Sequence, residues 1–227
     1  MPKIYPFKGW RFNKNIIGDI SQVIAPPYDV INDADQSALY ERSSYNYVRI
    51  ILNRSAGMGR YSEAAKTFSE WKKNEILIQD MDPSIYLLCQ SFRQDEQQIE
   101  RTGFITKLQI TKLGDDVLPH EQTISKHIND RYNLMKATKA NTGQIFMSYR
   151  DQTRTVESIL GAYKDQIPLI DAVLDGIQYR LWRLTDEGQI NTIRNVVTGT
   201  KVIIADGHHR YKTAYNYAQD HPEINGS

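Results

Sequence analysis

Cysteine is nearly absent from this sequence, which has only one in 227 residues. A single cysteine excludes an internal disulfide, and it excludes any metal or redox site that needs two thiols. The one thiol, Cys89, follows the apolar residues Ile85, Leu87 and Leu88. Cysteine in apolar surroundings behaves as a small hydrophobic residue, so the pattern predicts a buried position in a strand.

The chain also has no excess charge of one sign and no long hydrophobic run. Its 28 basic and 27 acidic residues leave a net charge of +1. Non-specific nucleic-acid binding needs a basic face, so nucleic acid is not an expected partner, although a local basic patch is compatible with these totals. The N-terminus has no apolar signal segment, and no run reaches the roughly 20 residues of a membrane span. These absences predict a cytoplasmic protein without a membrane contact.

What the sequence contains is the composition of an ordinary globular protein, with 40% hydrophobic and 24% charged residues. Helical and strand patterns mix without a regular strand–helix–strand rhythm, which favours an α+β fold, a mixed sheet with flanking helices. We expect residues 1–227 to form one α+β domain or two closely packed lobes, about 1–150 and 151–227. The chain stops soon after its last predicted helix, so we expect it to be the N-terminal part of a longer protein.

Hydrophobic periodicity and turn residues place the individual elements. An amphipathic stripe from Tyr61 to Trp71 predicts a helix with one buried face. Asn32 or Asp33 is available to cap the helix that follows, and Gly199 is expected in the left-handed conformation just after a helix. Helices are predicted at 33–42, 61–71, 129–140, 155–165, 186–197 and 208–219, strands at 47–52, 84–92, 101–113, 144–150, 178–184 and 201–205, and a hairpin loop at 93–98.

The last predicted strand runs directly into five polar or glycine residues, Asp206-Gly207-His208-His209-Arg210, at the start of a helix. A helix N-terminus combines unpaired N–H groups with the positive end of the helix dipole, which suits an anion. Gly207 permits close backbone approach, Arg210 offers a bidentate fork, and the histidines offer neutral donors, a general base or metal ligands. A simpler interpretation has Asp206 as the helix cap and the histidines as polar surface. Four functional groups exceed what one cap requires, so we favour an anion site.

A second polar segment, residues 119–123 (Pro-His-Glu-Gln-Thr), offers His120, Glu121 and Thr123. It lacks the histidine three residues after Glu121 that a zincin helix needs. These side chains either face a polar substrate or belong to the start of a helix, with Pro119 and Glu121 in its first turn. The sequence leaves both interpretations open.

A third segment, residues 26–29 (Pro-Pro-Tyr-Asp), holds an aspartate directly after a rigid turn. Asp29 is either a positioned carboxylate or part of a structural turn with Tyr28 packed beneath it. The glycines at Gly57 and Gly59 lack the Gly-Lys-Ser/Thr ending of a phosphate-binding loop, so a Walker site is not supported.

Three boxes in this order resemble those of an uncharacterised prokaryotic family that carries only a domain-of-unknown-function label. They are Ala-Pro-Pro-Tyr-Asp-Val-Ile at 25–31, Pro-His-Glu-Gln-Thr at 119–123 followed by Asp130-Arg131, and Ile-Ala-Asp-Gly-His-His-Arg-Tyr at 204–211. Members of that family are usually much longer, which implies that this chain is its N-terminal half. The last box is also similar to the phosphate-binding box of the ParB/sulfiredoxin superfamily, and most similar to that of the free serine kinases.

The second resemblance implies a phosphoryl-transfer site with a ParB/sulfiredoxin-like element around the last strand, turn and helix. The donor would be a nucleotide or pyrophosphate, bound together with Mg²⁺, and the acceptor a hydroxyl of a small molecule, most plausibly free L-serine. The residues implied in holding the donor phosphates are Asp206, Gly207, His208, His209 and Arg210.

Phosphoryl transfer also needs a carboxylate that orients the attacking hydroxyl. Asp29 or Glu121 meets this need, and Glu121 is preferred because His120 is next to it. Two other functions stay open: a nucleotide-binding regulatory module of the ParB kind, and a metal-dependent hydrolase. The hydrolase would draw its ligands from His120, Glu121, Asp206, His208 and His209.

Overall fold

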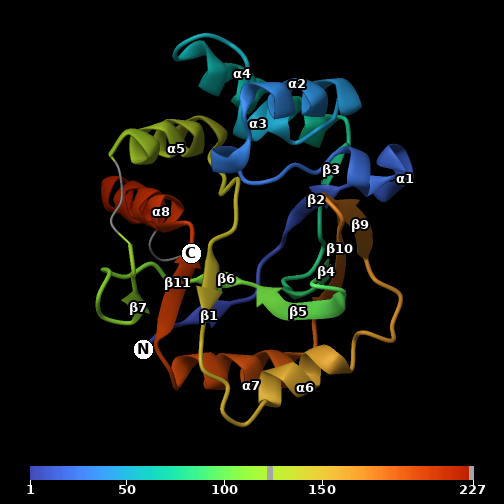
Figure 1. Ribbon diagram of the computed structural model, residues 1–227. Helices are drawn as coiled ribbons and strands as arrows, with labels where there is room; N and C mark the ends of the chain where they lie inside the picture. Colours follow the sequence, from blue (N-terminus) through green and yellow to red (C-terminus); the bar gives the residue numbers. More distant parts are fainter. Residues whose placement is uncertain (122–124, 225–227) are drawn as a thin grey trace.

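The computed structural model describes residues 1–121 and 125–224, and its helices surround several small sheets (Figure 1). This architecture confirms the α+β class. The largest sheet is antiparallel, with strand order β5-β4-β10-β9. Two-residue turns, Asp95-Glu96 and Asp175-Gly176, join its hairpins, and their φ angles are all positive, as type I′ turns require. The strands are β4 (Ile85–Gln94), β5 (Gln97–Ile105), β9 (Ile170–Leu174) and β10 (Ile177–Leu184).

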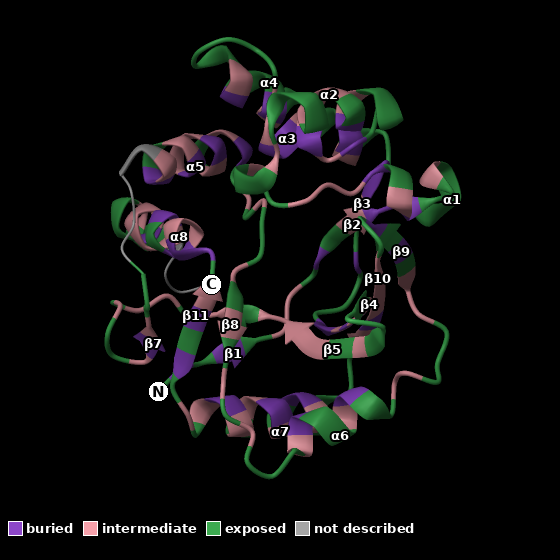
Figure 2. Ribbon diagram, viewed as in Figure 1, coloured by how far each residue is buried: buried purple, intermediate pink, exposed green. Residues whose placement is uncertain are grey.

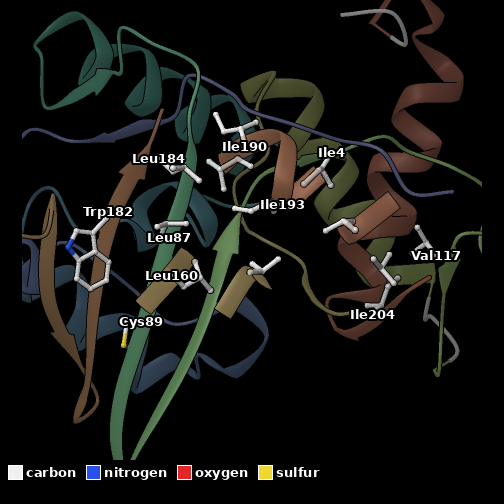
Figure 3. Packing of buried hydrophobic residues seen from close by; sticks show 14 of the residues in the cluster. Ile4, Leu87, Cys89, Val117, Leu160, Trp182, Leu184, Ile190, Ile193 and Ile204 are labelled. Atoms are coloured by element: carbon white, nitrogen blue, oxygen red, sulfur yellow. The ribbon is translucent and has the colours of Figure 1, made fainter. Parts of the chain in front are cut away.

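Hydrophobic residues of this sheet pack with those of α6 (Thr155–Gly161) and α7 (Glu187–Thr198) in the main core (Figure 3). Cys89 lies in this core with 1% of its surface exposed, which confirms the predicted buried strand position. A fully buried Leu or Ile contributes about 1.5–3 kcal/mol relative to an exposed one, so this layer is a major source of stability. Other core residues labelled in Figure 3 are Leu87, Leu160, Trp182, Leu184, Ile190 and Ile193.

The second sheet leads to the polar segment near the C-terminus. Its order is β7-β11-β8, with β11 parallel to β7 and antiparallel to β8, so this sheet is mixed, as expected. The register shifts between Ile204 and Asp206, an irregularity that re-aims the end of β11. Figure 1 shows β11 running into α8, which packs beside α5, and Figure 2 shows buried residues along β11. These elements are β7 (Val117–Leu118), β8 (Phe146–Ser148), β11 (Val202–Asp206), α5 (Ser125–Thr138) and α8 (His208–Asp220).

The N-terminal part adds a layer of helices and two short strand pairs. α4 (Gly59–Lys73) buries the predicted stripe from Tyr61 to Trp71. Asn32 caps α2 in a reciprocal pair of hydrogen bonds with Asp35, so this predicted cap is confirmed. The remaining elements are α1 (Lys14–Ile17), α2 (Asp33–Arg42), α3 (Val48–Ile51), β1 (Ile4–Tyr5) paired with β6 (Lys107–Leu108), β2 (Trp10–Phe12) paired with β3 (Leu77–Gln79), and 3-10 turns at Ile20–Gln22, Tyr28–Val30 and Pro222–Ile224.

The strand predicted at 47–52 is wrong, because this segment forms the short helix α3. Val48 and Ile50 are almost completely buried, and a continuous apolar run fits a buried helical turn as well as a buried strand. Asn46 favours the helical turn. Its side-chain amide donates to two backbone carbonyls of the N-terminal segment, while its oxygen accepts from the Val48 N–H at 3.0 Å. These hydrogen bonds stabilise the turn, and an extended strand at this position would not form them.

Other boundaries also differ from the predictions. Gly199 has a φ of −75° and donates to the Asn195 carbonyl, so it continues the right-handed turn and is not left-handed. The loop expected at 93–98 is a two-residue turn, because β4 and β5 pair up to Gln94 and Gln97.

β9 has no counterpart among the predicted strands. β10 pairs with β4 and β11 pairs with β7, so segments before and after residue 150 share both larger sheets. Over the described ranges, no helix has the length and apolar character of a membrane span.

Candidate functional site

The chain enters the candidate site through a left-handed turn between β11 and α8. Gly207 has a φ of 94°, a conformation that strains residues with a Cβ. The first helical hydrogen bond of α8 runs from the Tyr211 N–H to the Gly207 carbonyl at 2.9 Å. Asp206 does not cap the helix, and no other described side chain caps it, so the capping interpretation is wrong. The positive end of the helix dipole therefore faces the polar residues around this turn.

Arg210 folds back over the same turn. Its guanidinium donates to the Asp206 carboxylate and to the backbone carbonyl of Gln144. A Cβ on Gly207 would lie 3.0 Å from the guanidinium carbon of Arg210, so the guanidinium would have to move by a few tenths of an ångström, while the backbone conformation itself favours glycine. Arg210 is thus fixed at the start of α8, with its charge shared with a carboxylate.

His208 is the first residue of α8, is only 2% exposed, and joins the helix to residues 120–121. Its Nε2 accepts a hydrogen bond from the His120 backbone N–H at 3.2 Å, and its Nδ1 lies 3.5 Å from a Glu121 carboxylate oxygen. An acceptor at Nε2 places the proton on Nδ1, facing Glu121, in the tautomer assigned from these contacts. Burial first, and then His120, lower the pKa of His208 against the pull of the nearby carboxylates. The imidazole is therefore neutral near pH 7.

His120 is oriented by β11. Its Nδ1 lies 2.6 Å from the Ile204 carbonyl, so Nδ1 carries the proton and donates, and the lone pair is on Nε2. The rings of His120 and His208 meet edge to face, with centroids 4.6 Å apart. One ligand atom from each of these histidines and from Glu121 lies within 4.8 Å of the other two. We call His120, Glu121 and His208 the histidine cluster.

His209 lies beside His127 of α5, with ring centroids 5.2 Å apart. Burial is the main cause that lowers the pKa of His209, and His127 adds to it. The carboxylates of Glu121 and Asp29 oppose this shift, so both lie near enough to act on the imidazole. His209 is therefore coupled electrostatically to the segment that carries Glu121 and to the one that carries Asp29.

The 26–29 segment is tied to α5 through Tyr28. The Arg131 guanidinium lies over the Tyr28 ring, 3.8 Å from its centroid, in a cation–π contact. Burial raises the pKa of the Tyr28 hydroxyl; Arg131 opposes this shift and Asp29 adds to it. Asp29 is exposed in the same 3-10 turn. All three boxes therefore meet around α5 and the start of α8.

Arg131 also belongs to a second polar group, formed with α4. Asp130 accepts hydrogen bonds from Arg60 at 2.6 Å and from Tyr61 at 2.8 Å. The same carboxylate accepts from Arg131, whose guanidinium also donates to the Ile51 carbonyl at 2.9 Å. Burial alone would raise the pKa of Asp130, but Arg131, Tyr61 and Arg60 hold it below its usual value. We call Arg60, Tyr61, Asp130 and Arg131 the arginine cluster.

The predicted site residues thus fall into two groups. Residues of the second and third boxes are in direct contact with one another, whereas Asp29 acts on His209 at longer range. Thr123 lies outside the described residues. A groove of about 400 Å³ lies between α5 and the C-terminal half of α8 and contains no residue of the histidine cluster. The groove is lined by Ile128, Asn129, Tyr132, Asn216, Gln219 and Asp220.

Tyr28, His127 and Arg131 join the site although the sequence assigns none of them a chemical role; Tyr28 and Arg131 stand in the first two boxes, and Tyr28 is expected there only to pack beneath the turn. One signal for two of them exists in the sequence, because His127 and Arg131 are four residues apart and so share a face of α5. Nothing in the sequence pairs Arg131 with Tyr28, since about a hundred residues separate them and the contact depends on the packing of α5.

A protein-family model with the description "Protein of unknown function (DUF1015)" matches residues 4–227, nearly the whole chain. No curated protein and no solved structure matches the chain. The similarity of the last box to the ParB/sulfiredoxin superfamily therefore stays a prediction.

Proposed function

The chain belongs to this family of unknown function, as its three boxes predict, and we propose that it is a phosphotransferase acting on a hydroxyl of a small molecule. One observation carries the proposal. Three segments far apart in the sequence meet at the N-terminus of α8, where the N-cap residue Gly207 has no side chain to cap the helix, and they place two exposed carboxylates, Glu121 and Asp29, around it. Free L-serine is the first acceptor to test, because the last box is similar to that of the free serine kinases.

The donor phosphates would bind at the start of α8. A thirteen-residue helix brings a dipole whose positive end attracts phosphate oxygens. His209 and Arg210 are partly exposed there, while His208 is buried and acts through Glu121 rather than by touching the donor. The exposed carboxylates around the turn offer the oxygen ligands that Mg²⁺ prefers, and a bound Mg²⁺ would neutralise charge on the phosphate oxygens. The residues present therefore fit a magnesium-bound nucleotide or pyrophosphate.

Glu121 is the proposed general base. Transfer forms a bond between the acceptor oxygen and phosphorus, breaks the bond from phosphorus to the leaving phosphate or nucleotide, and moves the hydroxyl proton to the base. The Glu121 side chain is 65% exposed, so an acceptor can reach it, and the His208 Nδ1–H at 3.5 Å helps to orient it. Asp29 is the second candidate because its carboxylate acts on the same region of α8.

The ParB-like regulatory module remains the second candidate function. The β11–Gly207–α8 unit, a strand that enters a helix through a glycine turn, supports a phosphate-binding element equally in both cases. The two differ in whether bound nucleotide is consumed. A base such as Glu121 is needed only for transfer, and it is therefore the residue that separates them.

The test is transfer of labelled phosphate from ATP, ADP or pyrophosphate to L-serine and a panel of small alcohols, with Mg²⁺ present. Removing a general base typically lowers kcat by about 10²–10⁴-fold, so Glu121→Gln should do so while the exposed Glu63→Gln in α4 leaves the rate unchanged. Folded protein that transfers phosphate from none of these donors would refute the kinase. Nucleotide binding without turnover would favour the regulatory module.

A further inference from the structure

We infer that the histidine cluster binds one divalent transition-metal ion, Zn²⁺ or a similar ion. The donors are two imidazoles and one carboxylate, with ligand atoms all within 4.8 Å of one another. Glu121 is exposed, His120 is exposed, and His208 is anchored in the buried first turn of α8. The cluster thus combines one fixed ligand with two that can adjust.

The separation of the donor atoms is close to that of a metal site. The His208 Nδ1 and the Glu121 oxygen are 3.5 Å apart, and the edge of a tetrahedron with ~2.1 Å bonds is about 3.4 Å. The third donor lies within 4.8 Å of the other two, so it needs to approach by up to about 1.4 Å to complete the same tetrahedron. A shift of the exposed 120–121 segment relative to α8 supplies that movement, and no change in the core is required.

His120 already has the hydrogen bonding of a metal ligand. Its Nδ1–H donates to the Ile204 carbonyl at 2.6 Å, which fixes the ring and leaves the lone pair on Nε2. A metal-binding histidine almost always donates its other ring N–H to a carbonyl, carboxylate or water, because that contact sets the tautomer and raises the basicity of the ligand. The Ile204 carbonyl, in the middle of β11, provides this support.

His208 has a competing hydrogen bond that metal binding must break. Its Nε2 accepts from the His120 N–H at 3.2 Å, so Nδ1 carries the proton in the metal-free state. Coordination through Nδ1 moves that proton to Nε2, where it would meet the His120 N–H. The 120–121 segment must therefore shift relative to α8 as the ion binds, and the tautomer of His208 reports the change.

The donor set selects the class of ion. Imidazole nitrogen suits Zn²⁺, Co²⁺, Ni²⁺ and Fe²⁺, whereas Mg²⁺ and Ca²⁺ prefer oxygen ligands. Three protein ligands leave one position of a tetrahedral ion open, at the start of α8 where we propose that phosphate binds. An ion bound to Glu121 would occupy the proposed general base, so in the metal-bound protein Asp29, the second candidate, would take that role. The metal site rests on the cluster alone, and its test requires no phosphate donor, so it can fail or succeed separately from the phosphotransferase.

The test is binding of Zn²⁺ and Co²⁺ to untagged, chelator-treated protein, followed by calorimetry and by the visible absorption of Co²⁺. We expect one ion per chain and the intense absorption of a four-coordinate Co²⁺ site. Removing a residue that only hydrogen-bonds to a metal ligand lowers metal affinity by about 10–100-fold. His120→Ala and Glu121→Gln each remove a ligand itself, so each should weaken binding by more than about 100-fold. His221→Ala, beyond the other end of α8, should bind as the natural sequence does.

Ring nitrogen NMR supplies a measurement that does not depend on affinity alone. Addition of Zn²⁺ should move the proton of His208 from Nδ1 to Nε2 and shift the amide signal of His120. Absence of binding at millimolar metal, or binding that His120→Ala and Glu121→Gln leave unchanged, would overturn the site. These exposed positions are chosen because His208→Ala removes a buried side chain and is expected to disturb folding.

Discussion

The arginine cluster and the histidine cluster each contain one carboxylate, and the two carboxylates differ in how fully they are paired. Asp130 accepts hydrogen bonds from Arg60, Tyr61 and Arg131, and 20% of its side chain is exposed. Glu121 has the neutral His208 imidazole as its described partner, with Nδ1 at 3.5 Å, and 65% of its side chain is exposed. The first carboxylate is enclosed by donors, and the second remains accessible.

This difference separates a structural role from a chemical one. Closed, well-paired charges resist exchange of partners, because each lost hydrogen bond would leave a partly buried charge without compensation. The arginine cluster therefore holds α4, α5 and the Tyr28 turn in place. Imidazoles beside an exposed carboxylate can accept an ion or a substrate without first breaking a strong pair. The histidine cluster is the part of the molecule suited to chemistry.

The largest expected effect comes from removing the enclosed carboxylate. Breaking a buried ion pair by removing one partner costs about 3–5 kcal/mol, and Asp130 keeps some exposure, so Asp130→Ala should lower the free energy of unfolding by about 3 kcal/mol. Glu121→Ala, in the exposed pair, should cost less than about 1 kcal/mol. Urea denaturation monitored by circular dichroism measures both.

The control for this pair is Glu63→Ala on the exposed face of α4, which should change stability by less than about 0.5 kcal/mol. Similar losses for Asp130→Ala and Glu121→Ala would mean that the two clusters do not differ in the way their pairing indicates.

A smaller loss of stability is expected at the turn that carries the histidine cluster. Gly207→Ala places a Cβ at a φ of 94° and 3.0 Å from the Arg210 guanidinium. The left-handed conformation costs an ordinary residue about 1–2 kcal/mol, so we expect a loss of that size in the free energy of unfolding. Gly59→Ala is the matched control, because that glycine starts α4, has an ordinary φ and meets no atom within 4 Å. A neutral Gly207→Ala would show that the turn tolerates a side chain.

Features with a local cause were predictable from the sequence. The Asn32 cap, the stripe of α4 and the strand–turn–helix at Gly207 each depend on residues a few positions apart. The segment 47–52 was not predictable, because its helical turn depends on bonds from Asn46 to a distant part of the chain. In this segment, tertiary hydrogen bonds outweigh the strand preference of the local sequence.

The same distinction applies to the site. The residue types at His120, Glu121 and His208 indicate chemistry in any fold, so they could be read from the sequence. Their pairing could not, since the bond from the His120 N–H to His208 spans 88 positions and requires β7 and β11 to be neighbours. Arg131 and Tyr28 are even farther apart in the sequence, and their contact follows from the packing of α5.

The smallest expected effect is a pH dependence of stability to which His208 of the histidine cluster contributes and the arginine cluster does not. Burial and His120 hold the pKa of His208 below its ordinary 6.5. Between that value and the lower pKa of the folded state, the unfolded chain binds a proton that the folded chain does not, so stability falls as the pH drops below 6.5. In His208→Gln the amide oxygen can still accept from the His120 N–H, and nothing titrates. The loss of Tm between pH 7.5 and 5.5 should therefore be smaller in this variant than in the natural sequence. The difference should be less than about 3 °C, because His209 also has a lowered pKa and contributes part of the loss in both proteins. The lowered pKa of Asp130 changes stability below about pH 4, which is outside the pH range of this measurement. An equal loss of Tm in the two proteins would show that the fold does not hold His208 neutral.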